Sequence, residues 1–142
     1  HMCHVVRCKV FPSGVGYAKI HSFTESTGDE FIEAMRTSLN NCSSLIIDLR
    51  GNSGGVVMSA TDIAAYFLPR GSILTRFAMS NGVVKTMTSL NRRPNAHLPI
   101  CVLVDERTAS SCEILAAALA ENDRAVVWGK PTLGKVFLLI SK

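Results

Sequence analysis

Apolar and polar residues follow strand-like patterns at several places along this 142-residue chain. Residues 16–23 alternate between apolar and polar side chains, which predicts a strand with one buried face. Residues 44–49 and 100–104 are short, nearly continuous apolar runs, typical of strands that are buried on both faces of a parallel sheet. Residues 124–128 and 136–140 predict two further strands.

Helical patterns lie between these strands. After Thr27, apolar side chains recur at helical spacing, and Thr27 with Glu30 is predicted to form a capping box. A second amphipathic helix is expected to stop before Pro69, because a residue before proline disfavours the helical conformation. The alanine- and leucine-rich residues 110–121 predict a third helix with small, buried faces.

Residues 72–90 predict a hairpin that turns at Asn81-Gly82. The predicted order is therefore β-α-β-α-hairpin-β-α-β-β. Buried strands that alternate with helices favour an α/β fold with a largely parallel sheet and right-handed crossovers. Binding sites of such folds lie in the loops at the carboxyl ends of the strands, so the loops after Leu49 and Val104 become the candidates.

The composition predicts a folded protein rather than a disordered or membrane-spanning one. With 47% apolar and 18% charged residues the chain is expected to fold, and no apolar run reaches the roughly 18 residues of a membrane span. The net charge of +4 is scattered, without a concentrated basic stripe, so nucleic acid is not a predicted partner. No secretory signal is evident. His1-Met2 resembles a cloning remnant, and residues 1–13 are interpreted as a tag remnant with an N-terminal extension.

The cysteines do not predict a disulfide framework, because their number is odd and no Cys-x-x-Cys pair occurs. Cys101 lies in an apolar run and is expected to be a small buried hydrophobic residue. Cys3, His4 and Cys8 lack a fourth partner for zinc, so neither a metal nor a cofactor is predicted. The five cysteines are at positions 3, 8, 42, 101 and 112.

The glycine-rich run at residues 50–55 follows a predicted strand. Its backbone N–H groups could hold an oxyanion, because they lie free at a strand-to-helix turn. The glycines do not have the spacing of a nucleotide-binding loop. The alternative is a tight connection that needs residues with positive φ, and spacing alone favours neither interpretation.

Ser110 begins the third predicted helix, where the helix dipole would favour developing negative charge on a reacting group. The alternative is purely structural: Thr108 or Ser110 caps the helix, and Ser111 or Glu113 completes a capping box. There is no Gly-x-Ser-x-Gly elbow, which disfavours an α/β-hydrolase.

A reactive serine needs a base. His21 and His97 are expected to be surface histidines, because no acidic residue is placed to orient them. Lys135 lies between apolar segments, and desolvation lowers the pKa of a lysine. The alternative is an ordinary loop lysine that extends its charge into solvent.

Taken together, IIDLRGNSGG and LVDERTASSCEILAAALAENDRAVVWGKPTLGK resemble the catalytic core of the C-terminal processing (tail-specific) proteases, peptidase family S41. Residues 108–114 match the family's SASASEI stretch in register, with Ser110 at the place of the nucleophile and Lys135 at that of the general base. The resemblance covers residues 14–135. It implies a crotonase/ClpP-like α/β fold of repeated β-β-α units with a largely parallel sheet.

The resemblance also implies a mechanism and a substrate class. Ser110 would attack a peptide carbonyl while neutral Lys135 takes its proton, and the backbone N–H groups of Gly55 and Ser111 would form the oxyanion hole. The substrates would be proteins with exposed apolar C-terminal tails. The residues expected to support this arrangement are Gly54 and Glu113.

The chain departs from the family pattern at the lysine. Leu139 occupies the place of a glutamine that usually orients the lysine, and Val136 replaces a glycine. Cys112, which replaces a serine, is out of register as a nucleophile. Residues 14–142 are expected to form a protease core without the family's PDZ domain and C-terminal part. The alternatives are a catalytically impaired scaffold or interaction module, and an acyl-CoA enzyme, which the Ser-Lys spacing disfavours. Oligomeric state and compartment (periplasm, chloroplast lumen or intracellular in the family) are not predicted.

Overall fold

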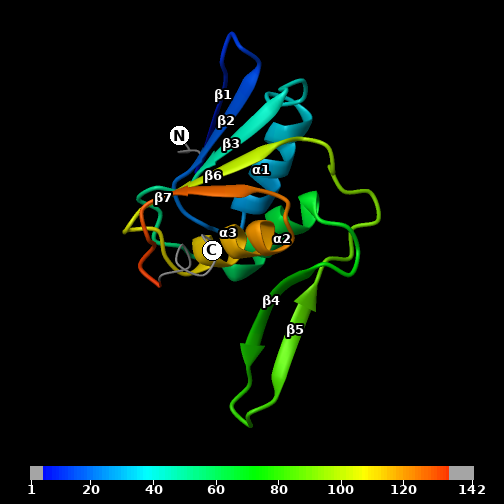
Figure 1. The fold of residues 1–142 in the computed structure, drawn as a ribbon, viewed down its shortest axis with the longest axis vertical. Coiled ribbons are helices and arrows are strands. Elements are labelled where there is room, and N and C mark those ends of the chain that lie inside the picture. The colour runs from blue at the N-terminus through cyan, green and yellow to red at the C-terminus, as the bar shows by residue number, and fades with distance from the viewer. Residues whose placement is uncertain (1–4, 135–142) are drawn as a thin grey trace.

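A five-stranded sheet forms the centre of the structure, a computed structural model that describes residues 5–134 (Figure 1). The strand order is β1-β2-β3-β6-β7; β1 is antiparallel to β2, and the other neighbours are parallel. This confirms the predicted α/β class with a largely parallel sheet. The strands are β1 (Val6–Val10), β2 (Val15–Ile20), β3 (Ser44–Asp48), β6 (Ile100–Val104) and β7 (Val126–Gly129).

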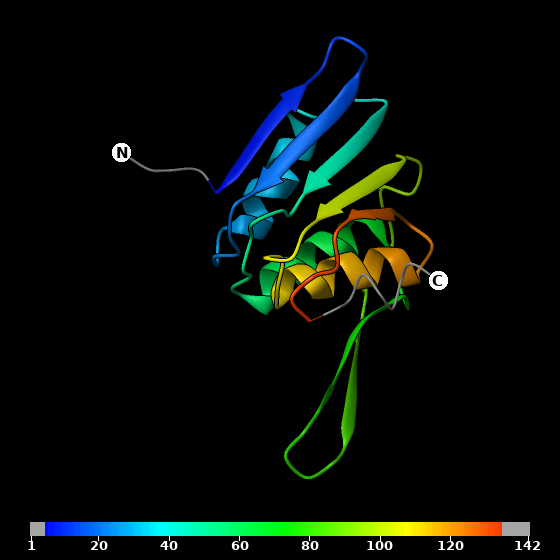
Figure 2. The same ribbon diagram turned by 60° about the vertical axis from the view of Figure 1, so that its left-hand side comes forward.

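Three helices cover one face of this sheet (Figures 1 and 2). Each helix connects two neighbouring parallel strands, and the chain crosses the sheet in one direction from β2 to β7. Because parallel crossovers are right-handed, all three helices fall on the same side. None of the helices within residues 5–134 combines the length and apolar character needed to cross a membrane. The helices are α1 (Thr27–Arg36), α2 (Val57–Phe67) and α3 (Ser111–Glu121).

The hydrophobic core lies between the helices and the sheet. Alternate strand residues face the helices, and burying each of the valine, leucine and isoleucine side chains among them stabilises the fold by roughly 2 kcal/mol. The fully buried strand side chains include Ala18, Ile20, Leu45, Ile47 and Val102. The helices bury Phe31, Ile63, Phe67, Leu115 and Leu119 against them.

The predicted hairpin is present as a separate two-stranded sheet, β4 (Ile73–Ala78) and β5 (Val84–Thr88). Its strands extend away from the helices and the main sheet (Figures 1 and 2). The turn includes Gly82, whose φ is +85°, and Met79 N–H donates to Val83 O at 2.7 Å. The prediction of a turn at Asn81-Gly82 is therefore correct.

Three local predictions were wrong. Strand β1 lies within the segment interpreted as an extension; of its residues only Val6 is buried, so the pattern of apolar residues was too weak to reveal an edge strand. Cys101 is half-buried, because it lies on the face of the sheet that the helices do not cover. The first helix begins after Ser26, whose Oγ donates to Glu30 Oε2 at 3.0 Å, in place of the predicted Thr27–Glu30 capping box. The strand expected at residues 136–140 lies outside the described residues.

Asp48, at the end of β3, is the centre of a charged network. Its side chain is almost fully buried, and Arg50 donates to it from Nε and Nη2, each at 3.0 Å. Tyr17 donates a further hydrogen bond, and Lys19 Nζ lies 3.6 Å from Oδ1. Burial alone would raise the pKa of Asp48, but these hydrogen bonds and the lysine charge outweigh it and lower the pKa from 3.8 to about 2. The network fixes the backbone at the start of the glycine-rich run.

This shift predicts a specific loss of stability in acid. The folded state holds the Asp48 proton more weakly than the unfolded state, so the carboxylate stabilises the fold above pH 4, and that stabilisation disappears as the pH falls to about 2. The free energy of unfolding should fall by about 2 kcal/mol over this range through this group alone. Denaturant unfolding at a series of pH values measures it. Asp48→Asn should remove this part of the pH dependence, whereas Glu106→Gln, at an exposed position, should retain it.

Candidate active site

The two loops singled out from the sequence meet at the carboxyl ends of β3 and β6. Gly51, in the glycine turn (residues 50–55), donates its N–H to Asp105 Oδ1 at 3.0 Å. Further along, Ala109 N–H donates to Asn52 O at 3.2 Å. These contacts join segments more than 50 residues apart in the sequence into one surface, as expected where neighbouring parallel strands end.

Ser110 has an unusual backbone conformation. It is exposed at the start of α3, and its φ is +57°, a value that only Asp123 shares in sign among the described non-glycine residues. Such a conformation is costly for a residue with a Cβ and persists only where the surroundings enforce it. The result is a sharp turn (residues 108–111, the serine turn) that presents the Ser110 hydroxyl at a helix N-terminus.

Two glycines of the glycine turn are required by this packing. A Cβ on Gly54 would lie 2.7 Å from Ser110 Cβ and 2.9 Å from Ala109 O, and its φ of +105° also favours glycine. A Cβ on Gly55 would lie 2.0 Å from Phe23 O. The glycine turn is therefore a tight connection that needs residues with positive φ, as one of the two interpretations of the sequence expected. Its close approach to Ser110 is a second reason for glycine at position 54.

The backbone N–H groups of Gly55 and Ser111 have no hydrogen-bond acceptor among residues 5–134. By contrast, Gly54 N–H donates to Asn52 Oδ1 at 2.8 Å. The Cβ position of Gly54 is 3.1 Å from Ser111 N, and Ser111 Oγ donates to Gly55 O at 2.7 Å, so the two residues are held together. Two unpaired donors beside Ser110 can stabilise an oxyanion.

Glu113 connects the serine turn to the loop after β7. As the third residue of α3 it accepts Ser110 N–H on Oε1 at 2.8 Å, which is the capping interaction left open by the sequence. Its Oε2 accepts hydrogen bonds from Thr132 Oγ1 at 2.7 Å and from Gly134 N–H at 2.8 Å. One carboxylate therefore holds Gly134, the last described residue, next to the turn that carries Ser110. Lys135 lies outside the described residues.

Cys112 is not a substitute nucleophile. It is fully buried, and its Sγ contacts Asn52 O at 3.3 Å. Burial raises the pKa of the thiol to about 12, so the reactive thiolate is absent at neutral pH.

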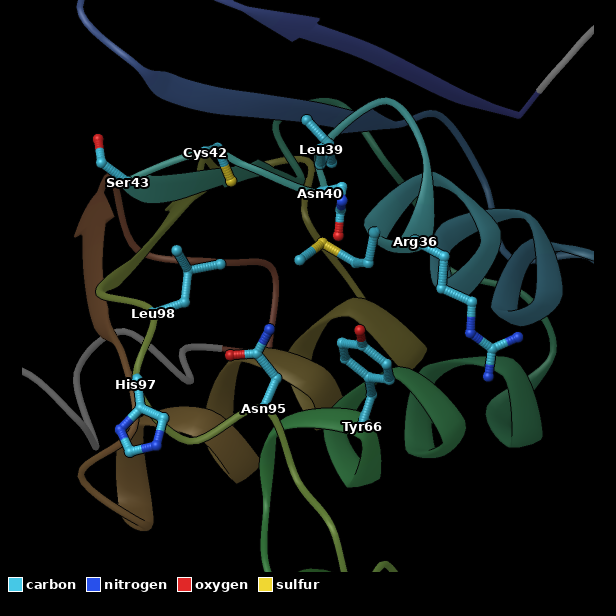
Figure 3. Close-up of a pocket in the computed structure, with 10 residues that line it drawn as sticks. Arg36, Leu39, Asn40, Cys42, Ser43, Tyr66, Asn95, His97 and Leu98 are labelled. Carbon is cyan, nitrogen blue, oxygen red and sulfur yellow. The ribbon is translucent and has the colours of Figure 1, made fainter.

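The histidines within residues 5–134 lie at the surface, as expected, and His21 lines a hollow together with Arg50, Gly51 and Asp105. His21 and His97 are both exposed. His97 lines a separate hollow of about 400 Å³ at the amino ends of β3 and β6, opposite the loops of the candidate site. Figure 3 shows Tyr66 and Asn95 pointing into this hollow.

Sequence reasoning missed two residues that organise the site. Asn52 is buried; its Nδ2 donates to Ile20 O at 2.9 Å while its Oδ1 accepts Gly54 N–H. The signal was available, since asparagine commonly bonds the backbone two residues further on. Thr132, which contacts Glu113, carries no comparable local signal.

Gly54→Ala should disrupt the site more than Gly51→Ala. Both glycines have positive φ, so backbone strain is common to the two variants, but only a Cβ at position 54 meets Ser110; Gly51 has no atom within 4 Å of its Cβ position. Overpacking of this kind costs roughly 1–3 kcal/mol. In denaturant unfolding, the free energy of unfolding should fall by roughly 1–3 kcal/mol more for Gly54→Ala than for Gly51→Ala. Equal losses would mean that contact with Ser110 does not constrain position 54.

Comparison with known proteins finds relatives that share most of this chain. Carboxyl-terminal-processing peptidase 2, chloroplastic, of Arabidopsis thaliana is 37% identical over 123 residues, which cover 85% of this chain and 24% of that protein. Carboxy-terminal processing protease CtpB of Bacillus subtilis is 35% identical over 128 residues, covering 89% of this chain and 26% of that protein. The chain thus spans about a quarter of the length of these curated relatives.

Comparison of the fold finds a protein of the same kind. A solved structure of the photosystem II D1 C-terminal processing protease superposes with a TM-score of 0.77 at 26% identity, covering 95% of this chain and 38% of the other. The sequence profile of peptidase family S41 matches residues 14–139, which include the glycine turn, the serine turn and Lys135. The resemblance seen in the sequence is confirmed: the chain belongs to peptidase family S41.

Proposed function

We propose that this chain is the proteolytic core of a serine peptidase in which Ser110 is the nucleophile and Lys135 the general base. The observation that carries the proposal is the Glu113 carboxylate, which binds Ser110 N–H on one oxygen and Gly134 N–H on the other. Gly134 directly precedes Lys135, so this bridge supports a lysine within reach of the serine hydroxyl. Family membership supports the same pair.

In the proposed reaction Ser110 Oγ attacks the scissile carbonyl carbon and its proton passes to neutral Lys135. The tetrahedral intermediate collapses to an acyl-enzyme as the lysine gives the proton to the leaving amine, and water then releases the acyl group by the reverse sequence. A lysine can act as this base only when uncharged, which desolvation by the neighbouring apolar residues would favour.

The carbonyl oxygen becomes negatively charged in the intermediate, and Gly55 and Ser111 are the proposed donors to it. Neither N–H group has a hydrogen-bond acceptor within residues 5–134, which supports this assignment. Each such donor contributes about 3 kcal/mol to lowering the barrier. The Ser111 hydroxyl, in place of the family's usual alanine, donates to Gly55 O and so links the two residues.

The substrates proposed are proteins with apolar C-terminal tails. A groove of about 230 Å³ runs between α3 and β4, with Glu113 at one end. Much of its wall is apolar, so it would accept apolar side chains close to the serine turn. The names of the relatives, which process carboxyl termini, support the same class. The apolar lining residues are Ile73, Leu74, Ile114 and Ala117.

A second candidate function is a scaffold or interaction module that keeps the fold without the reaction. Leu139, in place of the glutamine usual in the family, favours it, because a leucine cannot hydrogen-bond the lysine amine. The two functions differ in one measurable property, peptide-bond cleavage that depends on Ser110 and Lys135.

Ser110→Ala and Lys135→Ala should each reduce kcat on an unstructured protein with an apolar C-terminal tail by 10³-fold or more, in order of magnitude. Ser13→Ala and Lys130→Ala change exposed residues of the same types and should leave cleavage intact. Product formation is followed by mass spectrometry. Cleavage that survives both active-site changes would eliminate the dyad, and no cleavage by the unaltered chain or by the full-length protein would favour the scaffold.

Glu113→Gln should lower kcat by about 10²-fold with little change in KM. The amide replaces an acceptor oxygen with a donor, so at least one of the contacts with Ser110, Thr132 or Gly134 is lost and the catalytic groups move apart. Glu33→Gln, at an exposed position of α1, is the matched control. A purely structural role for Glu113 would instead lower the unfolding free energy while kcat of the folded protein stays constant.

A further inference from the structure

Within residues 5–134, the β4–β5 hairpin is attached to the rest of the molecule at its base. Leu74 is buried there, Asn122 Nδ2 donates to Ile73 O at 2.9 Å, and Ser89 Oγ donates to Leu68 O at 2.8 Å. Beyond this base the two strands pair only with each other among the described residues, and they stand away from the other elements in both views (Figures 1 and 2).

The tip of this hairpin (residues 77–84) is exposed, and apolar side chains flank its polar turn, Ser80-Asn81-Gly82. Phe77, Met79, Val83 and Val84 keep 46%, 40%, 51% and 61% of their surface accessible. Ala78 pairs with Val84 and Phe77 pairs with Lys85, so Val84 and Phe77 lie on opposite faces of the two-stranded sheet. The apolar surface therefore surrounds the tip. Exposed apolar surface of this kind marks a contact with a protein or a membrane, and each face of the tip also carries a cation, Lys85 beside Phe77 and Arg76 on the face of Val84.

Charge is distributed asymmetrically along the sequence of the same element, although in the fold Arg76 lines the groove that also contains Glu113 and Glu121. Residues 68–104 contain five arginines and lysines and no aspartate or glutamate, although the whole chain has a net charge of only +4. Arg76 and Lys85 each lie directly beside the apolar tip in sequence, next to Phe77 and Val84. Arg76 is three residues from Met79, which corresponds to about 10 Å along an extended strand. The remaining cations, nearer the base, are Arg70, Arg92 and Arg93.

We propose that the hairpin tip inserts into the surface of a bilayer that contains anionic lipids. Apolar side chains that enter the interface by 5–10 Å with cations at headgroup level are the arrangement such binding requires. Here Phe77, Met79, Val83 and Val84 would enter the interface, and Arg76 and Lys85 would meet the phosphates. The inference does not depend on peptidase activity.

Vesicle flotation of the 142-residue chain tests the proposal. The chain should float with phosphatidylcholine vesicles containing 30% phosphatidylglycerol, should not float with pure phosphatidylcholine, and should be released at high salt. Phe77→Ser with Val84→Ser should reduce binding at least tenfold. Val126→Ser with Trp128→Ser is the matched control, since these exposed apolar residues (65% and 69%) lie on β7. Equal binding by both double variants would overturn the proposal.

The charge requirement is tested in the same assay. Arg76→Gln with Lys85→Gln should weaken binding to anionic vesicles at least tenfold, while Arg7→Gln with Lys9→Gln, at exposed positions of β1, should not. In addition, Phe77→Trp in a Trp128→Phe background should show a blue shift of its emission when anionic vesicles are added. Circular dichroism verifies that each variant is folded. A different result would overturn the membrane proposal: the chain does not bind vesicles, and it self-associates in sedimentation velocity unless the tip residues are substituted. The partner of the tip would then be a second copy of the chain.

Discussion

The candidate site depends on one carboxylate. Glu113 lies in the first turn of α3, where the helix dipole favours a negative charge, and it accepts three hydrogen bonds from two segments of the chain. One oxygen fixes Ser110, and the other fixes Thr132 and Gly134. Without this bridge, one hydrogen bond within the described residues would still join the loop after β7 to the serine turn. In it, Leu133 N–H donates to Thr108 O at 2.9 Å.

The strain at Ser110 is tolerated because its neighbours leave no other conformation. Gly54 contributes no Cβ where one would meet Ser110, and Asn52 holds the Gly54 backbone from within the core. Thr108 Oγ1 donates to Leu49 O at 2.9 Å and ties the serine turn to the end of β3. Local strain of this kind gives an exposed hydroxyl a fixed direction, which a flexible loop could not provide.

The sheet supplies the frame for both loops. Its one helix-covered face buries the core, and on the other face the network around Asp48 anchors Arg50 at the point where the glycine turn begins. Because β3 and β6 are neighbours and parallel, their carboxyl ends bring the two loops to one edge, although the 51 residues 49–99 separate the two strands in the sequence. The base of the hairpin forms one wall of the groove beside α3, and the rest of the hairpin extends away from this frame.

The sequence by itself determined the elements that short-range patterns encode. Periodicity located β3, β6 and the three helices, Asn81-Gly82 located the hairpin turn, and the motifs around Ser110 and Lys135 identified the family. Only the tertiary structure decided the edge strand β1, the positive φ of Ser110 and the roles of Asn52 and Thr132. The period of the hydrophobic pattern indicates which face of an element is buried. It does not indicate which distant backbone group a polar side chain will contact. Those partners are fixed only when the folded chain brings the segments together.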